Sequence, residues 1–156
     1  MLNLMEKIRR RFRFSWNSWG AQAERKVRRI LEQLPMDRFI VMNDVRIKYG
    51  NIDHLVIRDD GAIFIIETKS HRGTVTFDGK QILLNRKPFK KNPICQMNRN
   101  IRWLREYFPL LTGESTWFTA ILVFPEAKLQ IIRPVKGIQC VGTPAELARL
   151  IAGTKR

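Results

Sequence analysis

Cysteine, long apolar runs and acidic residues are all scarce in this sequence, and no internal repeat is visible. The 156-residue chain has only two cysteines, Cys95 and Cys140, which excludes a disulfide-rich secreted scaffold and a zinc site of spaced cysteines. The longest apolar stretches, such as residues 117–124, are far too short to cross a bilayer. No apolar stretch of a signal peptide follows the basic N-terminus. A reducing, cytoplasmic compartment is therefore the expectation.

The shortage of acidic residues is the first indication of function. Twenty-nine lysines and arginines stand against fourteen aspartates and glutamates, which gives a formal charge of +15. Such a chain predicts a polyanionic partner, nucleic acid first and an anionic membrane surface second, in preference to a merely solvated basic face. No acid lies between Asp78 and Glu106. The predicted nucleic-acid-binding residues in this interval are Lys80, Arg86, Lys87, Lys90, Lys91, Arg99 and Arg102.

The chain divides into a short N-terminal segment, residues 1–19, and one domain, residues 20–156. The segment repeats large apolar side chains at helical spacing with arginines between them, which predicts a basic amphipathic helix. Docking on the domain is favoured over membrane contact, and DNA contact is compatible with docking. Exposed apolar residues in this segment could also support a homodimer.

Helical and strand-like patterns alternate through the domain. The expected helices are residues 20–34, 93–108 and 143–151. The expected strands are residues 39–47, 52–58, 62–69, 74–77, 81–85, 117–124 and 137–141. The last helix begins with a Thr-x-x-Glu capping box at Thr143. This order predicts an α/β or α+β domain around one mixed sheet.

Two acidic residues inside otherwise apolar strands give the strongest indication of chemistry. Asp53 and Glu67 lie among Ile, Val, Leu and Phe, where charges are rare unless they are paired or bind a metal. A three-residue loop, residues 59–61, would place Asp53 directly opposite Glu67, with Cβ atoms ~5 Å apart on one face. Lys69, two residues beyond Glu67, projects from that same face.

A divalent cation would relieve the repulsion between these two carboxylates. Oxygen ligands favour Mg²⁺ or Mn²⁺ over zinc. Lys69 would hold or help deprotonate an attacking water, or neutralise charge on a phosphate. The alternative is an ordinary ion pair between Glu67 and Lys69. The opposed Asp53 and the basic chain favour a site that acts on a phosphodiester.

Short motifs in this region resemble a known family. The segments Ile52-Asp53-His54-Leu55-Val56 and Phe64-Ile65-Ile66-Glu67-Thr68-Lys69 are similar to the nuclease-related domain (NERD) of the PD-(D/E)xK superfamily. The similarity continues at residues 73–75, 92–96 and 123–124, and covers about residues 19–150. It implies a restriction-endonuclease-like core, in which helices flank a central mixed sheet.

The resemblance also implies roles for the strand residues. Asp53 and Glu67 would bind the metal together with the main-chain carbonyl of Thr68. Lys69 would be the catalytic lysine.

Two helical residues acquire roles only through the resemblance. Glu24 matches the family's helical glutamate and would reach the metal directly or through water, although Ala23 stands where the family usually has glycine. Gln96 matches a glutamine beside the site. Taken alone, Glu24 would be a solvated residue paired with Arg28, and Gln96 would fit a helix cap equally well.

Other chemically notable side chains are assigned structural roles. His54, next to Asp53 in a strand, should point to the opposite face as a core histidine, and His71 should lie in a surface loop. Core packing is the expectation for Trp103 and Trp117. The two cysteines are expected to be small buried side chains.

The predicted function is metal-dependent hydrolysis of DNA phosphodiester bonds by an endonuclease, with Mg²⁺ or Mn²⁺ as cofactor. RNA is the alternative substrate. Alternative functions are a non-catalytic nucleic-acid-binding module on a nuclease fold, a junction-resolving enzyme, and a peripheral membrane protein held by residues 1–19. The intact set of Asp53, Glu67 and Lys69 argues against the non-catalytic module, because a degenerate site would usually lose one of them.

Overall fold

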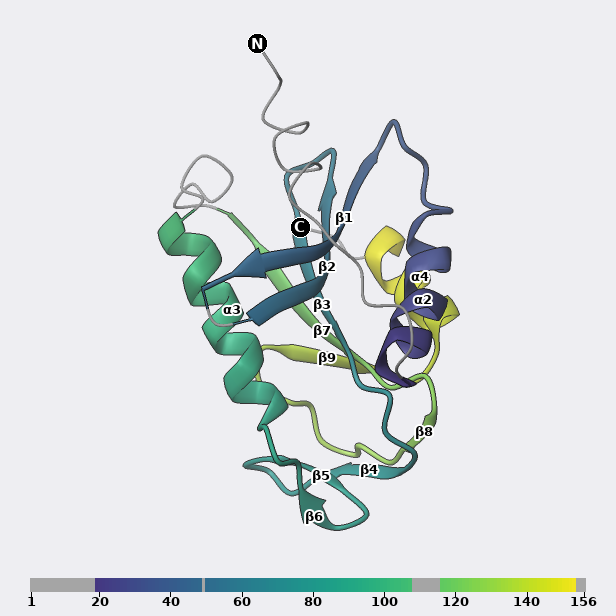
Figure 1. Cartoon of the computed structure of the whole chain (residues 1–156), viewed down its shortest axis with the longest axis vertical. Helices are drawn as coiled ribbons and strands as arrows, with labels where there is room; N and C mark the ends of the chain where they lie inside the picture. Colours follow the sequence, from purple (N-terminus) through teal and green to yellow (C-terminus); the bar gives the residue numbers. More distant parts are fainter. Residues whose placement is uncertain (1–18, 49, 108–115, 154–156) are drawn as a thin grey trace.

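The computed structural model describes residues 19–48, 50–107 and 116–153 (Figure 1). The N-terminal amphipathic helix predicted for residues 1–19 lies outside this part of the chain, except for its last residue. The described residues form three helices and nine strands. The helices are α2 (Trp19–Leu31), α3 (Pro93–Tyr107) and α4 (Pro144–Gly153). None of these helices is long and apolar enough to span a membrane.

The larger of two sheets is five-stranded and mixed, with the order β1-β2-β3-β7-β9. Its strands are β1 (Phe39–Ile47), β2 (Gly50–Arg58), β3 (Ile63–Thr68), β7 (Phe118–Val123) and β9 (Ile138–Val141). The first three pair antiparallel, whereas β3, β7 and β9 run parallel. The parallel pair β3–β7 requires a long crossover connection, and α3 lies in that connection. The predicted mixed sheet is confirmed.

Side chains that alternate along the central strands build a separate core on each face of this sheet. Leu55 and Ile65 point to one face, where Met97 and Leu104 of α3 pack on them. Val56 and Phe64 point to the other face, which α2 and α4 cover. Figure 1 shows this layering, with α3 on one side of the sheet and the other two helices together on the opposite side. The restriction-endonuclease-like arrangement of helices around a central sheet is therefore confirmed.

A second sheet of four short strands departs from the prediction of a single sheet. Its order is β6-β5-β4-β8, and its strands are β4 (Gly73–Phe77), β5 (Ile82–Leu84), β6 (Lys87–Pro88) and β8 (Ala127–Leu129). The hairpin formed by β4 and β5 was predicted. The strands β6 and β8 were missed because two or three residues are too few to show an alternating pattern. This small sheet lies at the end of α3 that carries Pro93 (Figure 1).

Candidate active site

The hairpin between β2 and β3 brings the predicted carboxylates together. The strands pair in register from His54 with Ile66 to Ile57 with Ile63. Gly61 closes the turn with a φ of 83°, a left-handed conformation that glycine adopts without strain. Continuing the register by one residue places Asp53 opposite Glu67. The turn and the register predicted for this hairpin are therefore confirmed.

Both carboxylates are buried on the face that α3 covers. Asp53 is 7% exposed and Glu67 is 6% exposed. The Asp53 Oδ2 atom accepts a hydrogen bond of 2.7 Å from the main-chain nitrogen of Thr68, so the end of β3 fixes its orientation. Lys69 directly follows β3, and its main-chain N–H donates a hydrogen bond of 2.8 Å to the carbonyl of Val123. These contacts fix the Asp53 carboxylate and the main chain at Lys69.

A compact hydrogen-bonded triangle joins Glu67, Lys69 and Gln96. The Lys69 Nζ atom lies 3.1 Å from Glu67 Oε1 and 2.8 Å from Gln96 Oε1. The Gln96 side-chain amide also donates to Glu67 Oε1, at 2.5 Å. Asn92 caps the start of α3 through its Oδ1 atom, which accepts from the main-chain nitrogen of Ile94 at 2.9 Å. Gln96 therefore lies beside the acidic pair, as the family resemblance implied.

Burial and mutual repulsion dominate the electrostatics of the acidic residues. Burial raises the pKa of Asp53 well above its ordinary value, and the nearby carboxylates of Glu67 and Glu24 add to this effect. Burial also raises the pKa of Glu67, although the charge of Lys69 and its hydrogen bond act in the opposite direction. The charges of Lys69 and Arg99 do not offset the effect of burial on these acids, whose pKa values stay raised. The pocket therefore favours either a proton or an added cation.

Glu24 of α2 joins this acidic group, together with a residue that the sequence analysis missed. Burial raises the pKa of Glu24, and the charges of Asp44 and Glu67 raise it further. Asp44 lies in β1 with a φ of 51°, and it interrupts the pairing with β2 at the position opposite Asp53. The sequence does show Asp44 as an acid within a strand that also contains Val, Met and Ile. The same kind of pattern had identified Asp53. Arg28, the alternative partner of Glu24, contacts Glu32 Oε1 through its Nε atom at 2.7 Å.

The donor set fits a hard divalent cation. Glu67 Oε2 is buried and has no hydrogen-bond partner within the described part of the chain. Among the described residues, no three His, Cys, Asp or Glu side chains are arranged to hold a metal by themselves. A cation here would therefore take two carboxylates, Asp53 and Glu67, and complete its shell with the Thr68 carbonyl and water. Glu24 would take part through water more readily than directly.

The two histidines behave as predicted. His54 is 2% exposed, and its Nδ1 atom lies 2.6 Å from Asn43 Oδ1 on the neighbouring strand. Burial lowers its pKa to about 3, so the ring is neutral at ordinary pH. His71 is an exposed loop residue whose ring contacts Phe89 edge-on, with 4.9 Å between centroids. Neither histidine is positioned as a metal ligand.

All seven predicted nucleic-acid-binding residues are exposed. They fall into two groups, one in and around the small sheet and one on α3. The first group is Lys80, Arg86, Lys87, Lys90 and Lys91, and the second is Arg99 and Arg102. Arg99 is close enough to Glu67 for its charge to oppose the burial that raises the pKa of that carboxyl. The basic surface therefore extends to the acidic pair.

Two of the structural expectations are wrong. Trp117 is 56% exposed instead of packing in the core, because it precedes the first residue of β7 rather than lying within the strand. Cys95 is exposed on α3, whereas Cys140 is partly buried and burial raises its thiol pKa to about 11. Trp103 packs partly against the core, as expected.

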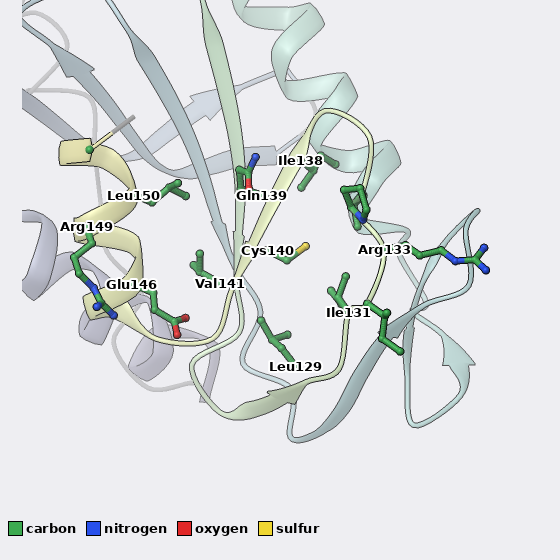
Figure 2. A pocket seen from close by; sticks show the side chains of 14 residues that line it. Leu129, Ile131, Arg133, Ile138, Gln139, Cys140, Val141, Glu146, Arg149 and Leu150 are labelled. Atoms are coloured by element: carbon green, nitrogen blue, oxygen red, sulfur yellow. The ribbon is translucent and has the colours of Figure 1, made fainter. Parts of the chain in front are cut away.

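An open groove of about 970 Å³ lies away from the acidic pair. It runs between β9, α4 and the chain from Leu129 to Val135, and Figure 2 shows its mostly apolar lining. None of the predicted site residues lines this groove. The acidic pair and its lysine are therefore separate from this hollow.

Comparisons with known proteins identify the family of this domain. The family model of the nuclease-related domain (NERD) matches residues 19–125, more than half of the chain. A comparison with curated proteins gave no match.

Two solved structures are similar at low sequence identity. A repair endonuclease from Pyrococcus abyssi is 17% identical, with a TM-score of 0.42, and the match covers 85% of this chain and 50% of that one. An EndoMS–dsDNA2 complex is 16% identical, with a TM-score of 0.33, and the match covers 81% of this chain and 49% of that one. This chain thus spans about half the length of each.

Proposed function

The chain belongs to the nuclease-related domain family, and from this premise we propose that it is a metal-dependent endonuclease that hydrolyses DNA phosphodiester bonds. The observation that carries the proposal is a convergence of side chains from three elements: Asp53 in β2, Glu67 and Lys69 at the end of β3, and Gln96 in the first turn of α3. An amine and two carboxylates in one buried cluster are the groups that hydrolysis of a phosphodiester requires.

Asp53 and Glu67 are the side chains that would hold a Mg²⁺ or Mn²⁺ ion, with the main-chain carbonyl of Thr68. The unpartnered Glu67 Oε2 atom and the raised pKa values of both acids support this assignment. When bound there, such a cation would supply Lewis-acid polarisation of a phosphate oxygen and ease the ionisation of water. Glu24 adds negative charge near the same position, which strengthens the preference for a cation.

Lys69 would act on the substrate side of the cluster. Its Nζ atom is held by two acceptors, Glu67 Oε1 at 3.1 Å and Gln96 Oε1 at 2.8 Å, which leaves its third N–H to donate to water or phosphate. A positioned ammonium group stabilises the negative charge that develops on a phosphate during attack. Gln96 is a positioning residue in this scheme, because it acts by orienting Lys69.

The exposed basic residues of the small sheet and α3 would bind the phosphate backbone of DNA. Lysine and arginine contacts to phosphates supply sequence-independent affinity. Asp53, Glu67 and Lys69 would then act on a backbone that this surface holds. A cytoplasmic setting and a homodimer remain predictions from the sequence.

Cleavage of labelled DNA tests this proposal. Single-stranded, duplex, forked and four-way-junction DNA would be incubated with Mg²⁺, Mn²⁺ or EDTA, and with the Asp53→Asn and Lys69→Ala proteins. Cleavage that requires metal and disappears in both variants is the expected result. The controls are Asp37→Asn, an exposed acid at the far end of the sheet, and Lys136→Ala, an exposed lysine beside β9, and both should cleave normally.

The opposite result is equally informative. Binding of every DNA without cleavage by either metal would refute DNA hydrolysis by this chain, and a labelled RNA panel would then separate a ribonuclease from a non-catalytic binding module. Cleavage that survives Asp53→Asn would show that the acidic pair is not the metal site.

A further inference from the structure

An aromatic pair on α3 lies in the same helical stripe as Gln96. Trp103 and Tyr107 are stacked, with ring centroids 5.2 Å apart and planes inclined by 25°. Because a helix turns by 3.6 residues, positions 7 and 11 residues beyond Gln96 return to its side. Trp103 and Tyr107 therefore lie about 10 Å and about 16 Å along the helix axis from Gln96. The pair therefore lies on the side of α3 that carries Gln96, toward the helix end at Tyr107.

The outer ring of this pair is unusually exposed for an aromatic side chain. Tyr107 is 52% exposed, while Trp103 is partly buried against the core cluster of the sheet face beneath it. Trp117, at the start of β7, is also exposed. Arg105 of α3 lies over the ring of Phe118, which follows Trp117, at 5.2 Å. Phe118 packs on the α3 side of the sheet, whereas Trp117 donates through Nε1 to Thr119, which points to the opposite face of β7. The exposed aromatic surface on the α3 side is therefore the stacked pair of Trp103 and Tyr107 itself, which is a candidate binding surface.

Positive charge accompanies the aromatic pair along α3. Arg99 lies between Gln96 and Trp103 in sequence and close to Glu67 in space, and Arg102 is exposed on the adjoining side of the helix. Aromatic faces beside a track of basic residues are the combination that binds unpaired nucleic acid, because the bases stack on the rings while cations contact the phosphates. Bases within a duplex are already stacked on each other and cannot use such rings.

We propose that Trp103 and Tyr107 form a stacking platform for unpaired bases, so that the substrate class is DNA with a single-stranded segment. The assignment of a substrate class rests on the proposed function. The stacking itself concerns binding and does not depend on hydrolysis. A single strand held on the platform would run past Arg99 toward Lys69. Free single strands and the unpaired arms of forked DNA present the same chemistry to this surface.

Binding of the full chain in EDTA tests the platform independently of cleavage. Fluorescence anisotropy would compare a labelled single strand, a fork with single-stranded arms, a blunt duplex, and a single strand of the same length with a run of abasic sites. Wild-type protein should bind the normal strand at least about fivefold more tightly than the abasic strand, because base stacking on an aromatic ring stabilises binding substantially. The response of the fork would show whether an arm beside a duplex is accepted as well as a free strand.

The Tyr107→Ala variant should bind the normal strand about fivefold more weakly than wild type, and should bind the abasic strand and the blunt duplex as wild type does. Tyr107→Phe should bind the normal strand within about twofold of wild type, because the ring is retained. Met36→Ala, at an exposed apolar residue outside α3, is the matched control.

Two results would overturn the platform. The first is an equal loss of affinity for all ligands in Tyr107→Ala, or no loss for any of them. The second is equal binding of normal and abasic strands by the wild-type protein, which needs no variant. A DNA panel that is bound through bases but never cut would leave the platform standing while refuting hydrolysis.

Discussion

The burial of Asp53 and Glu67 lowers the stability of the metal-free protein. An acid whose pKa is raised on folding holds its proton more tightly in the folded chain than in the unfolded one. The stabilisation from this source is present below the ordinary pKa near 4, and is lost as the pH rises through the higher folded value. The ionised pair is therefore most destabilising at neutral and alkaline pH, which is where a cation should bind best.

Replacement of Asp53 by asparagine should stabilise the metal-free protein. Asparagine can still accept the hydrogen bond from Thr68 but carries no charge to bury. We expect the melting temperature at pH 8 to rise by about 2–4 °C, which corresponds to ~1 kcal/mol for a domain of this size. Thermal melts in EDTA from pH 4 to pH 8 would measure the difference between variant and wild type.

The gain from this substitution should shrink as the pH falls toward 4, because wild-type Asp53 then becomes protonated. It should also shrink when Mg²⁺ is added at pH 8, since only the wild-type site binds the cation well. A gain that is the same at every pH would contradict the electrostatic explanation. Asp37→Asn provides the control for loss of an exposed acid.

Gln96 offers a separate test of the Lys69 position. Replacing Gln96 by alanine removes the acceptor 2.8 Å from Lys69 Nζ. We expect kcat to fall by about 10–100-fold, the usual effect of removing a residue that orients a catalytic group, while KM changes little. The Cys95→Ala protein, altered at the neighbouring exposed position of α3, should retain its full kcat. A rise in KM without a change in kcat would instead make Gln96 a substrate-binding residue.

Among the elements, the turn between β2 and β3 also anchors the last helix. Arg58 is 5% exposed, donates to Asp60 Oδ1 and Oδ2 at 2.9 and 2.7 Å, and donates to the carbonyl of Ile151 in α4 at 2.7 Å. Arginine near a helix C-terminus satisfies carbonyls that lack a partner within the helix. The hairpin that carries Asp53 and Glu67 is thereby tied to α4.

The Arg58→Met substitution should destabilise the protein by about 2–3 kcal/mol, because buried hydrogen bonds from a charged group are removed together. The same turn offers a matched comparison. Arg38 contacts Asp59 at 3.2 Å but both side chains are exposed, so Arg38→Met should change stability by less than about 0.5 kcal/mol. Urea unfolding of both variants would measure the contrast. Equal effects would mean that the contact with Ile151 contributes little.

Element length decides how much of this fold could be predicted from the sequence. The strands β1, β2 and β3 are largely apolar runs of six to nine residues, which are long enough to be recognised, and the opposition of Asp53 and Glu67 followed from the turn at Gly61. Short strands such as β6 have no detectable period, so the second sheet was missed. The sequence shows Asp44 as an acid inside a strand, but nothing local indicates that this acid will lie near Glu24. Contacts of that kind depend on how α2 packs against the sheet, which no local pattern encodes.

At the scale of the whole molecule, the +15 charge should control DNA affinity through salt. Each lysine or arginine that binds a phosphate releases counterions, so the logarithm of affinity falls linearly with the logarithm of salt concentration. The Lys90→Ala/Lys91→Ala double variant should reduce this slope by about two units, roughly one for each lysine that no longer binds a phosphate. Affinities measured between about 50 and 200 mM salt would give the slope.

The comparison needs a variant with the same loss of charge elsewhere. Lys136→Ala/Arg149→Ala removes two exposed cations beside the groove at β9, away from the acidic pair. Its slope should remain that of the wild type if DNA follows the small sheet and α3. A similar reduction in both double variants would show that only total charge matters.

The chain between Lys69 and Gln96 leaves the large sheet, builds most of the small sheet, and returns to a hydrogen bond of 2.8 Å between residues 27 positions apart. In the proposed enzyme, this hydrogen bond closes a loop that has the catalytic lysine at one end and the residue that positions it at the other. Doubling the length of such a loop adds only about 0.6 kcal/mol of closure entropy. The interior of this loop should therefore tolerate insertions, deletions and changes of charge at little cost in stability, while Lys69 and Gln96 keep their contact.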